Sequence, residues 1–203
     1  MLVQEIIKLG DITDEEKRLS LLLAIHCAPV LSGIKAANMV TVTQNEYIGI
    51  KYILKGTDIS CHFLKAGNNR GLLYLYREKE LISYLHLKEI AIFLEKYGYL
   101  PNNLDVMLGH LTKRMDSYCN GEIVFPHEIG VFLEYPLADV TGFLENKGKD
   151  FIYSGYWKVY HDVPETVRRF TQYDTVRYRM VRAVTSGRNI QEIMEGSASW
   201  RNL

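Results

Sequence analysis

Residues 59–77 read ISCHFLKAGNNRGLLYLYR, and this stretch decides the fold that we predict. Ile59–Lys65 and Leu72–Arg77 are short runs of the residue types that favour β-strands. Residues 66–71 between them (AGNNRG) are rich in glycine and asparagine, which favour tight turns. Two such runs around such a spacer are typical of an antiparallel β-hairpin, so the sequence predicts a sheet built on residues 59–77.

Helical and further extended segments flank this hairpin on both sides. In the helical segments, apolar residues recur at spacings of three and four. We predict one helix from a cap at Asp11 or Thr13 to near Cys27 and another that starts at Pro126. Further helices are predicted over 44–54, over 78–97 with a break near His86, and over 104–118, 136–148 and 164–187. Strands are predicted over 38–43 and 151–160. Without the extra helices, the order is strand, helix, strand, strand, helix, strand. This order predicts an α+β fold with an antiparallel four-stranded sheet of the ferredoxin-like split βαβ type, helices on one face and several additional helices.

The chain is predicted to form a single domain, 1–203. Its 203 residues are 47% hydrophobic and 24% charged, which are ordinary values for a globular protein. No internal repeat or linker rich in Pro, Gly or Ser divides the sequence. Within the domain we distinguish an N-terminal helical segment (1–37), the sheet and first helices (38–100), a helical insertion (101–150), and the last strand with the C-terminal helices (151–203).

Charge and hydrophobic patterning argue against several classes of function. Lys plus Arg (24) balances Asp plus Glu (24), so no net charge attracts the chain to nucleic acid or acidic lipid. The longest apolar runs have five residues, whereas a membrane helix needs about 20. The first residues lack the basic and apolar regions of a signal peptide. We therefore expect a cytoplasmic protein that has no nucleic-acid partner and no membrane association.

The cysteines Cys27, Cys61 and Cys119 are odd in number and far apart. Such spacing argues against a disulfide framework or a closed zinc site, and we predict no metal site. Cys27 lies at the predicted end of a helix, where the negative end of the helix dipole raises the pKa of a thiol. We therefore predict that Cys27 reacts slowly with alkylating agents.

The most unusual local string is FPHEIG at residues 125–130. If a helix starts at Pro126, His127 lies in its first turn and off its apolar stripe. The helix dipole there disfavours a charged imidazole, so His127 is a candidate neutral acid or base. The side chain of Glu128 diverges from it by about 100°, so the two do not form a dyad. The alternative is that His127 and Glu128 only cap the helix.

Three further residues are candidates for a ligand site. Trp157 lies on the alternating pattern of the predicted strand 151–160, and we expect it to be largely buried. Lys35 lies in a glycine-containing loop and Lys158 follows Trp157, so each is a candidate for holding an anionic group. Arg177 falls on the apolar stripe of the last helix. It must therefore pair with a carboxylate, line a pocket or lie on a partly hydrated face.

The tyrosines within residues 72–76 must be compared with the pattern of an RNA-binding sheet. Leu72, Tyr74 and Tyr76 would share one face of a strand, as the base-stacking residues of RNA-recognition sheets do. However, the string RGLLY at 70–74 has leucine at the first stacking position, and the chain has no net charge. A tyrosine-lined pocket or a sheet face covered by helices explains the same residues without RNA.

A family resemblance rests on the following strings: HCAP (26–29), GIK (33–35), Asn38, LYLYR (73–77), FPHEIG (125–130), Phe132-Leu133, YP (135–136), DV (139–140), GF (142–143), KG (147–148) and GYWKVY (155–160). Through them, most of the chain resembles the bacterial family called domain of unknown function 3793. The resemblance implies an origin in anaerobic, clostridia-like bacteria and a link to redox or metal physiology, and it brings no catalytic activity. Glu134 stands where glycine usually precedes the Tyr-Pro pair, and Tyr153 and Val176 stand where other members can have cysteines.

The sequence favours a small cytosolic binding or accessory protein, which the resemblance links to redox or metal homeostasis. We predict a cleft near Pro126 that is lined by Lys35, His127, Glu128, Trp157 and Lys158. Its ligand is a small molecule or a protein partner that the sequence does not identify, and no cofactor is identified either. Two alternatives stay open. One is an enzyme with His127 as general base and a lysine-stabilised anionic substrate; the other is a structural module that associates through its aromatic face.

Overall fold

The computed structural model describes residues 13–65, 70–100, 103–197 and 200. The chain combines helices with two small sheets, which confirms the predicted α+β class. Asp11, one of the two expected caps of the first helix, lies outside the described residues. Asp14 rather than Thr13 caps that helix, since its carboxylate accepts a hydrogen bond from the N–H of Lys17.

The main sheet has three antiparallel strands in the order β1-β3-β2: β1 (Ala37–Thr43), β2 (Ser60–Lys65) and β3 (Arg70–Tyr76). Strands β2 and β3 form the hairpin predicted over residues 59–77, with Cys61 opposite Leu75. Strand β1 pairs with the other edge of β3, where Val40 lies opposite Leu73. The central strand carries the run LLYLY because both of its faces are buried.

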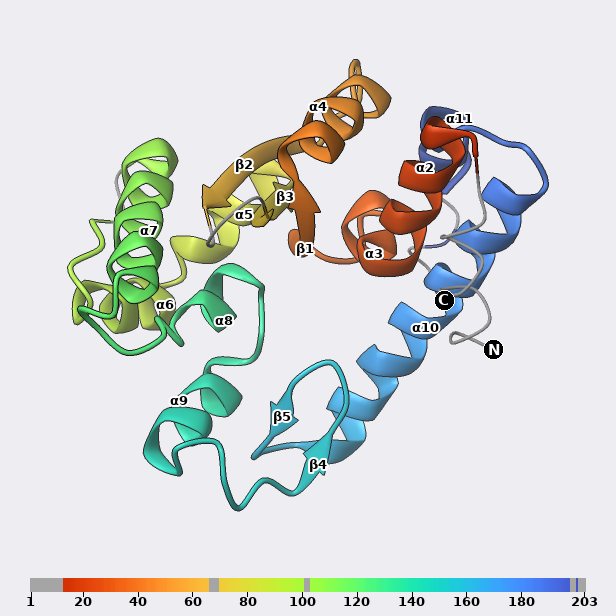
Figure 1. Cartoon of the computed structure of the whole chain (residues 1–203). Helices are drawn as coiled ribbons and strands as arrows, with labels where there is room; N and C mark the ends of the chain where they lie inside the picture. The colour runs from red at the N-terminus through yellow and green to blue at the C-terminus, as the bar shows by residue number, and fades with distance from the viewer. Residues whose placement is uncertain (1–12, 66–69, 101–102, 198–199, 201–203) are drawn as a thin grey trace.

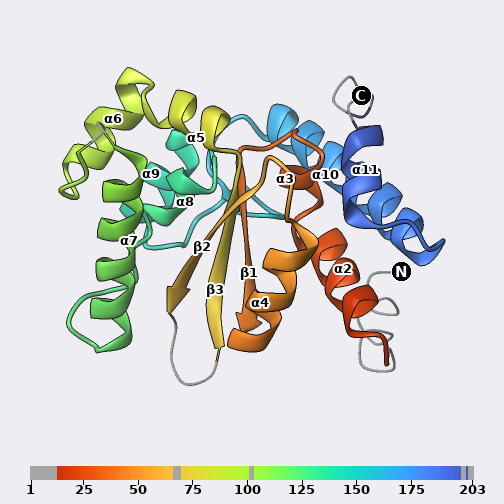
Figure 2. The ribbon, with the colours of Figure 1, turned by 90° about the horizontal axis from the view of Figure 1, so that it is seen from above.

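Helices cover both faces of this sheet, as Figures 1 and 2 show. The face that carries Val40 and Leu73 packs against α2 (Glu15–His26), α3 (Ala28–Leu31), α4 (Gln44–Ile53), α10 (Val163–Thr185) and α11 (Ile190–Gly196). The face that carries Leu64 and Tyr74 packs against α5 (Glu78–Leu85), α6 (Lys88–Glu95), α7 (Leu104–Cys119) and α8 (Ile129–Phe132). The expectation that helices lie on one face only is therefore wrong.

The long predicted helices have close counterparts in the structure. The segments 44–54, 104–118 and 164–187 correspond to α4, α7 and α10. The segment 78–97 is divided at His86 and Leu87 into α5 and α6, which confirms the predicted break near His86. Among the helices described, none is both long enough and apolar enough to cross a membrane.

Residues 151–160 do not form the predicted fourth strand. They fold back on themselves as a hairpin of β4 (Tyr153–Ser154) and β5 (Lys158–Val159), separate from the main sheet. The chain turns at Gly155, where a Cβ atom would lie 2.3 Å from a ring atom of α10. An alternating pattern describes one long strand and a tight hairpin equally well, whereas a glycine inside it marks a bend. The four-stranded sheet and the split βαβ topology are therefore wrong.

The helix expected from Pro126 also begins later than predicted. The N–H of Ile129 donates to the carbonyl of Pro126 at 3.0 Å, so residues 126–128 form a turn before the short helix α8. His127 lies in this turn and not in the first turn of a long helix. The dipole argument for its neutral form therefore does not apply. Helix α9 (Leu137–Glu145) follows directly after Pro136.

Candidate functional site

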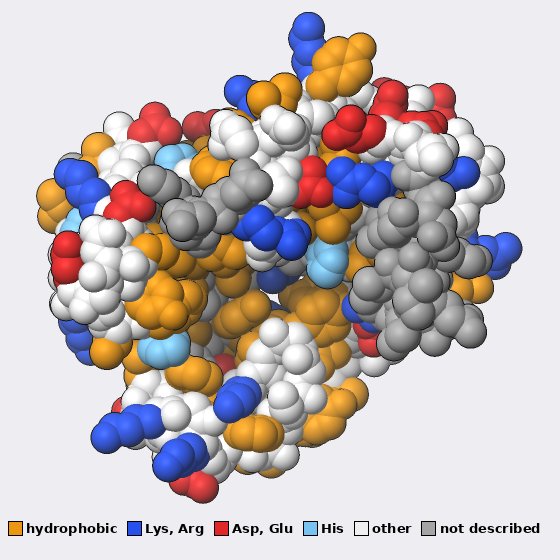
Figure 3. All heavy atoms as spheres, viewed as in Figure 1, with side chains coloured by type: hydrophobic (Ala, Val, Ile, Leu, Met, Phe, Trp, Pro, Cys, Tyr) orange, Lys and Arg blue, Asp and Glu red, His pale blue; other side chains and the backbone are white. Residues whose placement is uncertain are grey.

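Residues of helices α8 and α9, of the β4–β5 hairpin and of the adjoining turns line a half-open pocket of about 280 Å³. Its lining residues are Phe125, His127, Ile129, Gly130, Tyr135, Asp139, Val140, Phe143, Trp157 and Lys158. We call it the aromatic pocket, because rings make up much of its wall. Figure 1 places these elements together in the lower half of the view, and Figure 3 shows hydrophobic side chains around a hollow on the same face of the molecule.

A buried carboxylate fixes one wall of the aromatic pocket. One oxygen of Asp139 accepts hydrogen bonds from the backbone N–H groups of Tyr160 at 2.7 Å and His161 at 3.0 Å. The other oxygen accepts the indole N–H of Trp157 at 2.7 Å. Asp139 lies on α9 and its donors follow β4, so this cluster attaches the hairpin to the helix. Three N–H donors compensate the burial of the charge.

Trp157 is 7% exposed, which confirms the prediction that it is largely buried. Its indole stacks on the ring of Tyr135, with a centroid distance of 4.8 Å and an interplanar angle of 27°. It also packs edge to face with the ring of Phe170 on α10, with a centroid distance of 4.5 Å. Trp157 thus has a single packed orientation, and it presents a flat surface to the pocket.

His127 also lines the aromatic pocket. Its imidazole lies between the rings of Phe125, at 5.2 Å, and Phe143, at 4.7 Å. In the part of the chain that is described, its ring nitrogens have no hydrogen-bond partner. Partial burial lowers the pKa of His127 from its ordinary value, against the opposing effect of the Glu128 carboxylate. A neutral imidazole near pH 7 offers one donor and one acceptor to the pocket.

Lys158 also lines the aromatic pocket, but one of its ammonium protons already forms a hydrogen bond within the protein. Its ammonium donates to the carbonyl of Gly148 at 2.7 Å. The same nitrogen lies 4.8 Å from the ring centroid of Phe151 and 5.7 Å from that of Phe143. These contacts hold the charge at the edge of the pocket.

Glu128 does not line the pocket, contrary to the prediction. Its side chain is 1% exposed and is directed into the core, where it pairs with Arg114. It also accepts a hydrogen bond from the hydroxyl of Tyr99 at 3.1 Å. A carboxylate this deeply buried needs such partners, so Glu128 is a structural residue that joins α8 to α7.

Lys35 lies next to the pocket and not in its lining. Its side chain is buried, and its ammonium lies 5.1 Å from the ring centroid of Tyr135 and 5.8 Å from that of Tyr173. Burial lowers the pKa of Lys35 to about 8, although the carboxylate of Glu134 acts in the opposite direction. Lys35 therefore supports the Tyr135 wall from behind.

Glu134 has a backbone conformation that is uncommon for a residue with a side chain. Its φ is 56°, in the left-handed region that favours glycine. Its carboxylate accepts a hydrogen bond from the N–H of Ala36 at 2.6 Å. Burial raises the pKa of Glu134, while this hydrogen bond and the nearby Lys35 oppose the rise. The residue thus joins the turn after α8 to the loop before β1.

Two other sequence candidates have structural roles. Arg177 pairs with Asp174, whose side chain is 56% exposed, and it lies 5.6 Å from the ring centroid of Tyr156. It therefore meets a carboxylate on a partly hydrated face of the helix. Tyr74, which would stack a base in an RNA-recognition sheet, is fully buried and donates its hydroxyl proton to the carbonyl of Phe132 at 2.5 Å. That face of the sheet is therefore covered by helices.

The cysteines are not arranged for metal binding. Cys27 is fully buried, and burial is the main cause that raises its pKa, whereas the prediction relied on the helix end. Burial also raises the pKa of Cys61, to about 11. Within residues 13–65, 70–100, 103–197 and 200, no group of three or more His, Cys, Asp or Glu side chains lies close enough together to hold a metal ion.

The structure brings together three of the five predicted site residues, His127, Trp157 and Lys158. The residues that the prediction missed are Asp139 and Tyr135, together with the phenylalanines of the wall. Asp139 carries a weak sequence signal, since it is an acid in the first turn of the largely apolar helix LADVTGFLE. Its donors are 18 to 22 residues away, however, and the sequence alone does not bring them together.

Comparisons with known proteins identify the family and nothing more specific. A search of curated proteins and a search of solved structures found no match. A family model described as "Protein of unknown function (DUF3793)" matches residues 23–194, which include every residue of the aromatic pocket. Because this match covers most of the chain, the protein belongs to that family.

Proposed function

We propose that the protein is a small-molecule binding or accessory protein and that its ligand is a ring-bearing compound held in the aromatic pocket. The observation that carries the proposal is the combination of aromatic walls with one imidazole, His127, that has no hydrogen-bond partner among the described residues. Binding sites for small molecules are typically concave and mostly apolar, with a few polar groups that orient the ligand.

The volume of the pocket and its order support this proposal. At about 280 Å³ the pocket is at the small end of ligand sites. It therefore suits a compound with a small ring system better than a haem. Trp157 is held by both Asp139 and Tyr135, so the wall exists before a ligand arrives. A preformed wall reduces the entropy lost on binding.

An enzyme with a lysine-stabilised anionic substrate has less support. Lys35 lies beside Tyr135 and outside the lining, so it does not reach a substrate anion in the pocket. Among the described residues, the lining also contains no serine, threonine or cysteine that His127 could activate as a nucleophile. The link to redox or metal homeostasis is a separate prediction. Thermal-shift measurements with flavins and with divalent metals would test it.

The test is a thermal-shift screen with small aromatic and heteroaromatic compounds, followed by titration of the wild type and two variants. His127→Ala removes the unpartnered imidazole, and His161→Ala removes an exposed imidazole outside the pocket as the matched control. We expect His127→Ala to abolish the ligand-induced shift while lowering the free energy of unfolding by less than about 1 kcal/mol. Undiminished binding by His127→Ala, with a loss of about 1–3 kcal/mol in urea unfolding, would show that His127 is only structural.

A further inference from the structure

The two charged residues of the aromatic pocket differ in how many hydrogen-bond partners they have within the protein. Asp139 is 2% exposed, and its two oxygens accept three hydrogen bonds from N–H groups. Its charge is therefore compensated within the protein. A cationic ligand would find no free carboxylate in the lining.

Lys158 is in the opposite situation. An ammonium group has three N–H donors, and among the described residues only the Gly148 carbonyl accepts one of them. No carboxylate in the described part of the chain forms an ion pair with Lys158. Its other neighbours are the rings of Phe143 and Phe151, which attract the charge but accept no conventional hydrogen bond. The pocket thus has one positive charge with donors to spare.

The ring of Phe143 lies next to both polar groups of the wall. Its centroid is 4.7 Å from that of the His127 imidazole and 5.7 Å from the Lys158 nitrogen. The imidazole can donate one N–H, and the ammonium two, to an acceptor placed beside this ring. Hydrogen bonds to a charged acceptor in an apolar surrounding are stronger than those to a neutral one.

We propose that the aromatic pocket is selective for small aromatic monoanions, whose ring packs against Trp157 and Tyr135 and whose carboxylate is bound by Lys158 and His127. This inference rests on the proposed function and adds the charge of the ligand to it. A single negative charge matches the single uncompensated ammonium of the lining. A dianion would bring a second charge into an apolar pocket that has no partner for it.

The test compares benzoate with benzamide, which are similar in shape and differ in charge. Titrations followed by NMR would give the ratio of their dissociation constants for each protein. We expect benzoate to bind the wild type at least about tenfold more tightly, since a charge-assisted hydrogen bond replaces a neutral one. Lys158→Met should reduce this preference to near unity, and Lys158→Arg, which keeps the charge, should retain most of it.

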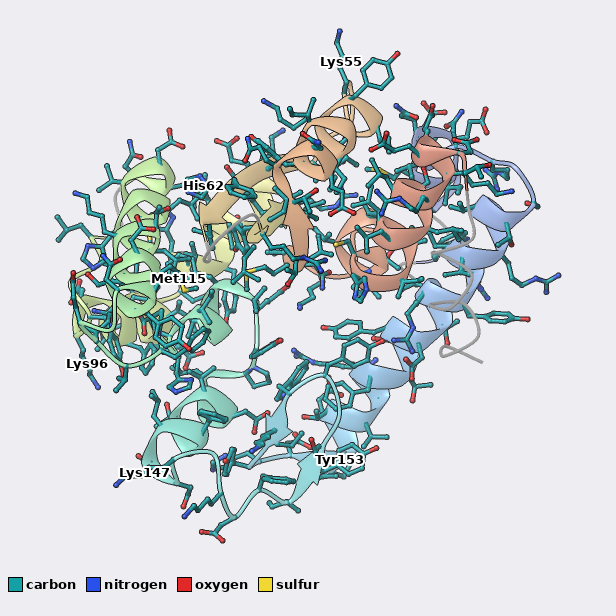
Figure 4. The ribbon with its side chains drawn as sticks, viewed as in Figure 1. Lys55, His62, Lys96, Met115, Lys147 and Tyr153 are labelled. Atoms are coloured by element: carbon teal, nitrogen blue, oxygen red, sulfur yellow. The ribbon has the colours of Figure 1, made fainter. Side chains whose placement is uncertain are left out.

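Lys147→Met is the matched control for the loss of one positive charge. Lys147 lies just after α9, and Figure 4 shows its side chain directed away from the molecule, so this variant should keep the preference. If the loss of the bond to Gly148 unfolds Lys158→Met, the dependence on salt provides a second measurement. The preference of the wild type for benzoate should then fall as the ionic strength rises.

The outcomes separate the two proposals. If benzamide binds as tightly as benzoate, or if other uncharged rings bind and benzoate does not, the charge selectivity is refuted and the binding pocket stands. If Lys158→Met folds and keeps the full preference, the role of Lys158 is refuted. If no ring compound of either charge binds, the proposed function itself fails.

Discussion

Replacing Lys35 by methionine would remove a buried ammonium while keeping most of the volume and length of the side chain. Lys35 is 6% exposed, and its nitrogen faces two tyrosine rings, so its charged form is poorly solvated. This burial lowers its pKa from 10.5 to about 8. Each pH unit of that interval corresponds to about 1.4 kcal/mol of free energy. The whole interval corresponds to about 3 kcal/mol.

The direction of the effect follows from proton binding. Below pH 8 the folded and unfolded chains both hold the proton, so the folded protein bears the full cost of the buried charge. Between pH 8 and 10.5 the folded protein has released a proton that the unfolded chain still holds. Raising the pH in that window therefore favours the folded state. Relative to Lys35→Met, the wild type should gain about 3 kcal/mol of unfolding free energy from pH 7 to 10.5.

The measurement is a series of urea melts of both proteins, under reducing conditions, at several pH values from 7 to 10.5. The cysteines and tyrosines also titrate in this range, but they are present in both proteins and cancel in the difference. Lys55→Met controls for the change in net charge, because Lys55 extends outward beyond the end of α4 (Figure 4). A difference between wild type and Lys35→Met that is flat with pH would refute the buried-ammonium interpretation.

Three further predictions concern backbone strain, the carboxylate beside the pocket, and the thiols. Glu134→Gly should be more stable than Glu134→Ala by about 1 kcal/mol in urea melts, because only glycine adopts the left-handed φ of 56° without strain. Asp139→Asn should lower the free energy of unfolding by about 1–3 kcal/mol, since an amide N–H would face the indole N–H of Trp157. In a double-mutant cycle, adding Trp157→Phe should recover part of that loss. Iodoacetamide should label the exposed Cys119 well before the buried Cys27, and equal rates read by mass spectrometry would contradict this order.

The parts of the fold that were predictable depend on neighbouring residues. The β2–β3 hairpin was predictable because the turn residues stand directly between its two strands. The break between α5 and α6 was also predicted, near His86. The segment 151–160 was not, because its alternating residues face α10 and α9 instead of a fourth strand position, and only Gly155 indicates the turn. Local patterns describe the shape of a segment, but its packing partner is decided at long range.

The candidate site was also predictable only where local sequence decides the position of a residue. His127 and Trp157 stand out as unusual residues, and both line the aromatic pocket. Glu128 stands beside His127 in the string, but it turns into the core because Arg114, 14 residues earlier, supplies its charge partner. Adjacent residues on a turn diverge, so closeness in sequence did not mean a shared site.

Tyr135 shows why the pocket depends on the whole chain. One neighbour of its ring is Trp157, which forms the pocket wall with it, and another is the ammonium of Lys35. The preceding residue, Glu134, accepts a hydrogen bond from Ala36, which is 98 residues away in the sequence. The loop before β1 therefore determines where the Tyr135 ring lies, although it contributes no residue to the lining. It follows that substitutions at Lys35 or Glu134 should weaken ligand binding without touching the ligand, because they release the wall on which it packs.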